Sequence, residues 1–402
     1  MNLNFQHLLS DAARAKVLQA FSSGEHSSAQ PGTRALERLS EATRLTQAGD
    51  LMAATAAIQA ALRGDAAASF PGATAFPQDP AAEVIDIEAR ELTPEPSANP
   101  APGNGDLAQS APAKPGPSEG HGQAGQFISG SHTEAAGTRA YKLYVPNRRT
   151  DEKLPLVVML HGCTQNPDDF AAGTGMNEAA RERGFYVLYP AQTQHANSSR
   201  CWNWFKHNHQ KRGKGEPALL TGMTREIMRT HPIDPARVYV AGLSAGGAMA
   251  AILGDTYPDV FAAVGVHSGL ASGSATDVQS AFSAMKTGAT QAPRAAASPP
   301  TIVFHGDLDG TVSPINGEQV VAASAAGARA HATHHQRNGR ACTQKIYRRD
   351  DGHIVAEHWA VHGAGHAWSG GSTAGSYTDA RGPDATDEML RFFFANPLPF
   401  RQ

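Results

Sequence analysis

From residue 127 onward, apolar residues gather in short continuous runs that are separated by stretches with helical spacing. The runs lie at residues 154–160, 185–190, 237–243, 262–268, 300–306 and 356–363. The segment 140–145 instead alternates polar and apolar residues, which is typical of a half-exposed strand. Continuous apolar strands with helices between them are characteristic of a mainly parallel sheet covered on both faces. The pattern therefore predicts a doubly wound α/β domain over residues 127–402.

Residues 1–68 show the spacing of helices rather than that of strands. Apolar residues recur at steps of three and four from Leu36 to Leu62, and a first helix is expected around residues 5–21. Helices this short bury little surface by themselves. We therefore predict a helical N-terminal segment that docks on another surface, with self-association or contact with a granule as its candidate roles.

Residues 69–126 are rich in proline, alanine and glycine. Ten of the 26 prolines lie between Pro71 and Pro117, and aromatic residues and long apolar runs are few. Such a composition buries too little apolar surface to offset the conformational entropy that folding removes. The segment is predicted to be a disordered, semi-extended linker.

Charge and cysteine content narrow the class of protein further. Lys and Arg total 34 against 37 Asp and Glu, a net charge of −3, which argues against a broad nucleic-acid-binding surface. No apolar run reaches the roughly 18 residues that span a bilayer. The first residues lack a basic stretch followed by an apolar one, so a cytoplasmic protein without a membrane span is expected. Three cysteines exclude a disulfide scaffold but leave room for one bridge.

The sharpest chemical signal is a G-x-S-x-G motif at residues 242–246. It follows the expected strand 237–243 and opens a helix expected over 245–253, which is the context of a nucleophile elbow. In such an elbow the serine lies on a strained turn, and glycine on either side relieves the crowding. We predict that Ser244 is a nucleophile and that the backbone N–H of Ala245 is one donor of an oxyanion hole.

A serine nucleophile needs a base, and the base needs an acid that orients it. Asp307 and Asp309 follow an expected strand, and Asp309 is preferred because it lies farther out on a loop that can fold back. His366 lies in a glycine-rich loop after the last apolar run, whereas His362 is expected at the end of a strand. The order Ser244, Asp309, His366 is that of α/β-hydrolase triads.

The loop after the first buried strand offers the second donor of this predicted oxyanion hole. There His161-Gly162-Cys163 fits an H-G-x donor loop, in which the backbone N–H of Cys163 acts and the thiol need not react. A bridge between Cys163 and Cys201 is conceivable, but the sequence does not decide it. Trp202 and Trp204 either line a substrate groove or anchor the core, and the sequence favours neither alternative.

No metal site and no cofactor site is expected. His331, His334 and His335 lie close together without the paired spacing or the carboxylates of a metal site, so a solvent-exposed face is the simpler interpretation. The basic stretch 206–214 is expected to be an exposed loop.

Five motifs extend this interpretation to a family. They are LHGCTQ, CWNWF, GLSAGGAMA, HGDLDGTV and GHAWSGG, at residues 160–165, 201–205, 242–250, 305–312 and 365–371. With them the chain resembles the poly(3-hydroxybutyrate) depolymerase-like esterases of the α/β-hydrolase superfamily over about residues 140–394. The resemblance implies an α/β-hydrolase fold, with Ser244 as nucleophile, His366 as base, Asp309 as orienting acid and Cys163 in the oxyanion hole.

The expected function is therefore that of a serine esterase that needs no cofactor. Its substrate is expected to be a short-chain poly- or oligo(3-hydroxyalkanoate), cleaved through an acyl-enzyme intermediate. Similar sequences include feruloyl and acetylxylan esterases, so a carbohydrate-linked ester is the alternative within catalysis. A third interpretation is a hydrolase-like protein that binds a granule or a partner, which the presence of all three triad residues disfavours.

Overall fold

The computed structural model describes residues 125–147, 152–290 and 298–399. Within them lies a ten-stranded sheet with the strand order β1-β2-β4-β3-β5-β6-β7-β10-β9-β8. The strands are β1 Gln126–Glu134, β2 Gly137–Val145, β3 Leu154–Leu160, β4 Tyr186–Pro190, β5 Ile233–Leu243, β6 Ala263–His267, β7 Thr301–Gly306, β8 Arg329–Arg337, β9 Arg340–Arg348 and β10 Ile354–Val361. The predicted helical segment 1–68 and nearly all of the predicted linker 69–126 lie outside the described residues.

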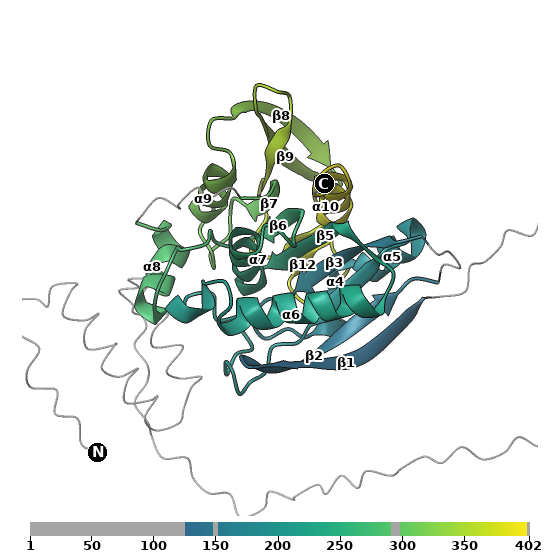
Figure 1. The fold of residues 1–402 in the computed structure, drawn as a ribbon. Helices are drawn as coiled ribbons and strands as arrows, with labels where there is room; N and C mark the ends of the chain where they lie inside the picture. The colour runs from purple at the N-terminus through teal and green to yellow at the C-terminus, as the bar shows by residue number, and fades with distance from the viewer. Residues whose placement is uncertain (1–124, 148–151, 291–297, 400–402) are drawn as a thin grey trace, which may run out of the picture. The chain divides into compact units, whose positions relative to one another are not determined.

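The six apolar runs form the six central strands of this sheet. From β4 through β3, β5, β6 and β7 to β10, every neighbouring pair is parallel. The pairs β1–β2, β2–β4, β10–β9 and β9–β8 are antiparallel, and Figure 1 shows β1–β2 and β8–β9 at opposite ends of the sheet. The prediction of a mainly parallel α/β sheet is confirmed.

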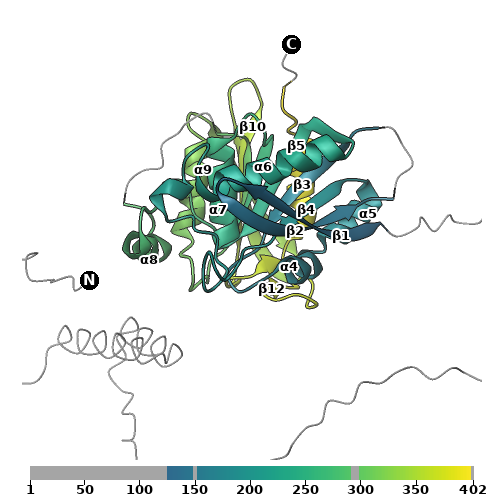
Figure 2. The same ribbon diagram turned by 60° about the horizontal axis from the view of Figure 1, so that its bottom comes forward.

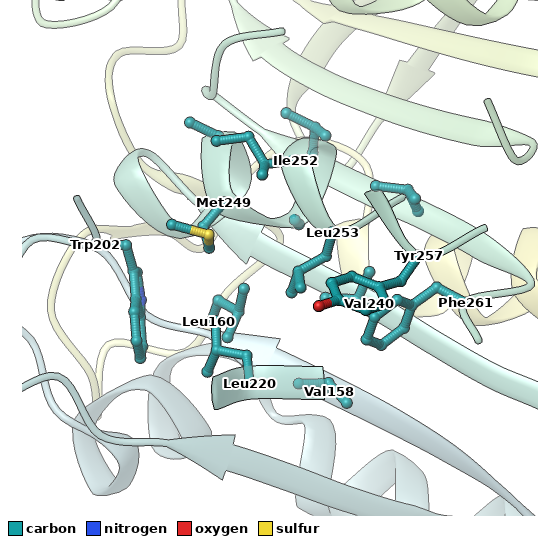
Figure 3. Close-up of a cluster of buried hydrophobic side chains, with 14 of the residues drawn as sticks. Val158, Leu160, Trp202, Leu220, Val240, Met249, Ile252, Leu253, Tyr257 and Phe261 are labelled. Atoms are coloured by element: carbon teal, nitrogen blue, oxygen red, sulfur yellow. The ribbon is translucent and has the colours of Figure 1, made fainter. Parts of the chain in front are cut away.

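Helices cover both faces of the sheet. They are α4 Pro167–Thr174, α5 Met176–Arg183, η1 His207–His209, α6 Gly215–Thr230, α7 Ala245–Thr256, α8 Val278–Thr287, α9 Ile315–Ser324 and α10 Ala385–Phe394. Alternate residues of β3 point to different cores: Val158 and Leu160 pack with α6 and α7, whereas Val157 and Met159 pack with α4, α5 and α10. Figure 3 shows the first of these cores. No helix in the described ranges is both long and apolar enough to cross a bilayer.

The strands β1, β8 and β9 were not predicted from the sequence. Nearly all of β8 is exposed, because it is an edge strand that faces solvent on both sides, so it carries no apolar pattern. Its histidines His331, His334 and His335 belong to this polar edge. Asn338-Gly339 joins β8 to β9 with two positive φ angles of 40° and 74°. An Asn-Gly pair is the strongest short-range hairpin signal, and it could have revealed this hairpin.

A two-stranded sheet follows β10 and packs beside α4. It consists of β11 Trp368–Ser369 and β12 Thr378–Asp379. The N–H of Ser372 donates to the carbonyl of Gly173 at 2.8 Å, and Figure 2 shows β12 next to α4. Residues far apart in the sequence are thereby joined near the carboxyl ends of the parallel strands.

Candidate active site

Ser244 lies at the turn between β5 and α7, with φ 57° and ψ −120°. Few non-glycine residues adopt a positive φ, and those that do concentrate at functional sites. Its N–H donates to the carbonyl of His267 at 2.9 Å, and its carbonyl accepts from the N–H of Ala248 at 2.9 Å. These two bonds hold the turn against the neighbouring strand and the following helix, and they leave the serine hydroxyl free to react.

Both glycines of the elbow are needed for this turn. A Cβ atom at Gly246 would lie 2.0 Å from the carbonyl oxygen of Leu160, and one at Gly242 would lie 2.4 Å from the backbone of Gly246. Atoms do not approach one another so closely. Residues other than glycine would therefore push α7 away from β3.

Gly246→Val is expected to lower the free energy of unfolding by at least about 3 kcal/mol, because the backbone of β3 would have to move. Chemical denaturation followed by circular dichroism measures this loss. Gly310→Ala is the matched control, since nothing lies within 4 Å of a Cβ atom built there. An unchanged denaturation midpoint for Gly246→Val would contradict the close approach of α7 to β3.

Asp309 and His366 come from separate loops and are in contact. Nδ1 of His366 lies 2.7 Å from Oδ2 of Asp309, whose side chain is fully buried. The other oxygen of Asp309 accepts from the N–H groups of Thr311 and Val312, both at 2.9 Å, so the loop folds back as its sequence suggests. An ionised carboxylate can only accept hydrogen bonds. The proton of the pair therefore lies on Nδ1 of His366, and its Nε2 is free to accept another.

The surroundings of Asp309 favour its ionised form. Burial works to raise the pKa of its carboxyl group, but contacts with His305 and His366 and the N–H of Val312 outweigh burial and hold the pKa well below its usual range. A carboxyl whose pKa is lower in the folded than in the unfolded protein adds stability above its unfolded pKa of about 4. That stability is lost as the pH falls toward the folded pKa.

This linkage predicts how acid affects the wild type and Asp309→Asn. The wild type should lose stability steadily below a pH of about 5, whereas the variant, which lacks this carboxyl, should lose less. Urea titrations at several pH values between neutrality and the acid range measure both slopes. Parallel slopes for the two proteins would show that Asp309 has an ordinary pKa.

Asp307, the second carboxylate of this loop, makes a different pair. Its Oδ2 lies 2.9 Å from Nδ1 of His362, and its Oδ1 accepts from the N–H of Gly363 at 2.7 Å. Both side chains of this pair are 42% exposed. No hydrogen bond joins Asp307 to His366 in the part of the chain that is described. Asp307 thus holds the start of the segment that leads to His366.

The loop after β3 lies directly against the elbow. A Cβ atom at Gly162 would lie 3.7 Å from the Cβ atom of Ser244. Among the described residues, the backbone N–H groups of Cys163 and Ala245 have no hydrogen-bond acceptor. Two unpaired N–H groups on segments that adjoin a serine are what a developing oxyanion requires.

His161 fixes the conformation of this loop. Its Nδ1 donates to the carbonyl of Gly162 at 2.7 Å, and its Nε2 accepts from the N–H of Gln192 at 3.1 Å. Burial lowers the pKa of His161 to about 4. The ring is therefore neutral near pH 7, which is the state that these two hydrogen bonds require.

A disulfide joins Cys163 to Cys201, with their Cα atoms 4.2 Å apart. The sequence left this bridge open. The bond ties the loop after β3 to the loop before η1, and it occupies the Cys163 thiol, which therefore cannot compete with Ser244 as a nucleophile. Cys342 is buried and free.

Cys201→Ala is expected to lower the free energy of unfolding by about 2–4 kcal/mol, because the crosslink no longer restricts the unfolded chain. Thermal unfolding with and without dithiothreitol measures the effect. Reductant should lower the Tm of the wild type and leave that of the variant unchanged. Cys342→Ala keeps the bridge and should still respond to reductant. A reduced wild type, verified by thiol counting, with an unchanged Tm would count against a stabilising bridge.

Trp202 and Trp204 are buried, with exposed fractions of 0% and 5%. Nε1 of Trp202 donates to the carbonyl of His161 at 3.1 Å. Figure 3 shows Trp202 at one end of the buried cluster that contains Leu160 and Met249. This burial favours the core anchor over the substrate groove, because a ring without accessible surface has none to offer a ligand.

His267, at the end of β6, is a supporting residue that the sequence analysis did not single out. Its carbonyl accepts from Ser244, and its Nε2 accepts from the N–H of Ser369 at 2.9 Å. Burial, followed by the nearby His305 and His366, lowers its pKa to about 3. His267 thus joins the elbow to the segment after His366. In the sequence it is a single histidine at the end of an apolar run, which gives no signal of this role.

Glu216 is a second supporting residue outside the sequence prediction. It is 2% exposed and accepts from Gln192 Nε2 at 2.5 Å and from both the backbone and side-chain nitrogens of Asn203 at 2.7 Å. Burial works to raise the pKa of Glu216, but contacts with His209, Gln192 and Asn203 outweigh burial and lower it. Through Gln192, which donates to His161, this carboxylate connects α6 to the loop after β3.

These groups together suit nucleophilic attack on a carbonyl carbon. They provide a serine on a strained turn, an imidazole oriented by a buried carboxylate, and two unpaired N–H donors. In the described ranges, no cluster of three or more His, Cys, Asp or Glu side chains is placed to hold a metal ion.

The sequence family described as esterase PHB depolymerase matches residues 139–341, which is just over half of the chain. The chain belongs to the esterase PHB depolymerase family. The matched region includes Ser244 and Asp309 and ends before His366, so the contact between Asp309 and His366 joins the family's matched region to the segment that follows it.

Two curated relatives of this esterase PHB depolymerase family member are named for different substrates. Poly(3-hydroxyalkanoate) depolymerase C of Paucimonas lemoignei is 38% identical over 180 residues, which cover 42% of this chain and 43% of the relative. Feruloyl esterase B of Thermothelomyces thermophilus is 36% identical over 140 residues, which cover 35% of this chain and 47% of the relative. The chain spans less than half the length of these curated relatives.

The fold can be compared with that of a solved structure. The acetyl xylan esterase from Aspergillus awamori superimposes with a TM-score of 0.51 at 19% identity, covering 66% of this chain and 99% of the other. At this identity the likeness concerns the fold alone. Together with the strand order, it confirms that this esterase PHB depolymerase family member has an α/β-hydrolase fold.

Proposed function

We propose that this chain is a serine esterase in which Ser244 is the nucleophile, His366 the base and Asp309 the acid that orients the base. The observation that carries the proposal is the 2.7 Å contact between Nδ1 of His366 and Asp309, together with a serine held at φ 57° between a strand and a helix. A hydroxyl, an imidazole and a buried carboxylate in this chain order are the components of acyl transfer on such a fold.

In the proposed mechanism, Nε2 of His366 removes the Ser244 proton while Oγ attacks the ester carbonyl. The carbonyl oxygen becomes an anion that accepts hydrogen bonds from the N–H groups of Cys163 and Ala245. The tetrahedral intermediate then breaks its bond to the alcohol, which leaves with the proton from His366. Water gives a proton to His366 and attacks the acyl-enzyme, which forms a second tetrahedral intermediate. This intermediate breaks its bond to Oγ of Ser244, which takes the proton back from His366 as the acid leaves.

The substrate that we propose is a short-chain poly- or oligo(3-hydroxyalkanoate). Membership in the esterase PHB depolymerase family supports it, as does a relative named poly(3-hydroxyalkanoate) depolymerase C. The second candidate is a feruloyl or acetyl ester linked to a carbohydrate. It is supported by the relative named feruloyl esterase B.

Initial rates on three substrates decide between these candidates. They are p-nitrophenyl acetate, a 3-hydroxybutyrate oligomer and methyl ferulate, each measured beside Ser244→Ala. Turnover that depends on Ser244 and favours the oligomer supports the first candidate. A preference for methyl ferulate keeps the mechanism and changes the substrate. A folded protein without Ser244-dependent turnover on any of the three would contradict the esterase proposal.

A cytoplasmic location, and granule contact or self-association through residues 1–68, stay predictions. The bridge between Cys163 and Cys201 bears on the location, because disulfides persist chiefly in oxidising compartments. Thiol alkylation of cell fractions, before and after reduction, tests whether the bridge exists where the protein works. Sedimentation of the full chain with polymer granules tests the contact.

A further inference from the structure

Arg200 lies beside the candidate oxyanion hole. Its Nη2 donates to the carbonyl of Thr164 at 3.2 Å, and Thr164 directly follows Cys163. The next residue, Cys201, is bonded to Cys163 through the disulfide. The N–H of Thr164 also donates to the carbonyl of Ser199 at 2.7 Å. These three links on successive residues hold the guanidinium close to the proposed donor N–H of Cys163.

The positive charge of Arg200 has no negative partner in the described part of the chain. No carboxylate there lies within ion-pair distance, in contrast to Arg139, which lies 3.7 Å from Glu216, and Arg237, which lies 2.6 Å from Asp234. The Nε atom of Arg200 is buried and has no hydrogen-bond partner. Arginine is well suited to bidentate binding of a carboxylate. Because Nη2 makes one hydrogen bond, the terminal nitrogens retain donors for such a ligand.

The backbone around Arg200 is strained. Thr164, Arg200 and Tyr377 have φ angles of 66°, 54° and 53°, in the left-handed region that favours glycine. They are also linked, since the Thr164 hydroxyl lies 3.2 Å from the Tyr377 hydroxyl. Such backbone conformations are strained, and strain of this kind concentrates at ligand-binding sites. The strained backbone and the unpaired charge of Arg200 therefore both favour a ligand-binding role for this residue.

We propose that Arg200 is a specificity-determining residue that binds a free carboxylate on the alcohol side of the scissile ester. In an ester formed by two 3-hydroxy acids, only two carbon atoms lie between the ester oxygen and the carboxylate at the chain end. With the carbonyl oxygen held at Cys163 and Ala245, a short leaving group of this kind would extend its carboxylate toward Arg200, which contacts the residue after Cys163. This inference rests on the proposed function and narrows its substrate to oligomers that carry a free carboxyl end.

The proposal also places the reaction in a sequence. An enzyme that recognises the carboxyl end adjoining the scissile bond releases one hydroxy acid unit at a time. Its substrates must then come from a reaction that cleaves a longer polyester into oligomers with free carboxyl ends.

The test compares two substrates that differ only in charge. They are the linear 3-hydroxybutyrate dimer and the same dimer with its carboxyl end converted to a primary amide. We expect Arg200→Gln to lower kcat/KM for the free acid about tenfold, mainly through KM, and to leave kcat/KM for the amide within about twofold of the wild type. Lys206→Gln is the matched control, because it removes one positive charge from an exposed position in the same loop, where the side chain has no hydrogen bond to Thr164. It should change neither value.

Further variants and conditions separate binding from loop structure. Arg200→Lys retains the charge without the bidentate geometry, so it should keep part of the preference for the free acid. Added salt should raise the KM of the wild type for the free acid and leave Arg200→Gln unaffected. An equal fall on both substrates in Arg200→Gln and Arg200→Lys assigns Arg200 a structural role and overturns the proposal. An unchanged rate on the free acid in Arg200→Gln overturns it as well.

Binding without turnover keeps this test independent of the esterase mechanism. Titration calorimetry of the free acid and of the amide into Ser244→Ala, and into the double variant with Arg200→Gln, measures recognition alone. Stronger binding of the free acid that disappears with Arg200→Gln supports the anion site even if the wild type hydrolyses neither dimer. Equal binding of both dimers overturns it, whatever the rates are.

Discussion

Ser244→Ala is expected to abolish ester hydrolysis while the protein stays folded. The hydroxyl is the only group at this position that can form the acyl-enzyme, and its loss in comparable triads lowers kcat on the order of a million-fold. The backbone bonds of Ser244 to His267 and Ala248 do not involve its side chain, so the elbow should persist. Rates on a 3-hydroxybutyrate oligomer, with circular dichroism on the same sample, measure both effects.

A matched control is available on the neighbouring strand. Ser268 directly follows β6, has a positive φ of 48° and is fully buried. Its hydroxyl lies 3.2 Å from Nδ1 of the supporting residue His267, so Ser268→Ala removes one supporting contact and leaves the proposed nucleophile in place. This variant should retain most of the activity. If Ser244→Ala kept substantial turnover, or if Ser268→Ala lost as much, the assignment of the nucleophile would be wrong.

Asp309→Asn is expected to lower kcat on the order of ten-thousand-fold. An amide can donate its N–H to His366, which would favour the tautomer with its proton on the wrong nitrogen, and it cannot stabilise the imidazolium. The contacts of Asp309 with the N–H groups of Thr311 and Val312 can persist through the remaining amide oxygen. The defect should therefore be catalytic rather than structural, with little change in KM.

Asp307→Asn is the matched comparison, because it makes the same change two residues earlier. Asp307 contacts His362 and Gly363, and it does not contact His366. We expect this variant to lose no more than about tenfold in kcat, since only the support of the segment weakens. Steady-state kinetics on both variants measure the difference. A larger loss for Asp307→Asn than for Asp309→Asn would reassign the acid.

Much of the fold could be predicted because its strands are buried on both faces. Every residue of β3 is buried, so its seven apolar residues reveal the strand without help from alternation. The elbow could be located because the motif coincides with a strand end and a helix start. Asp309 could be preferred over Asp307 from loop position, and the hydrogen bonds of Thr311 and Val312 give the physical reason for that preference.

The remainder depends on long-range contacts that leave no local pattern. β8 faces solvent along nearly its whole length, so its residues have no apolar periodicity. Glu216 is an ordinary helix-start glutamate in the sequence, and only the folded chain brings Gln192 and Asn203 to its carboxylate. The burial of Trp202 likewise depends on packing against α7 and β3. The sequence alone does not show whether Trp202 packs in this way or lines an open groove.

The two aspartates in the turn after β7 limit how far the length of this turn can vary. Asp307 is hydrogen-bonded to Gly363 and Asp309 to His366, so two carboxylates separated by one residue bind two positions of the same downstream segment. Surface loops generally accept insertions and deletions. Here a single residue added or removed between these carboxylates would displace one carboxylate relative to the other, so that both hydrogen bonds could not form together. Homologous chains should therefore vary in sequence at Leu308, which is 70% exposed, while keeping the spacing between the two aspartates fixed.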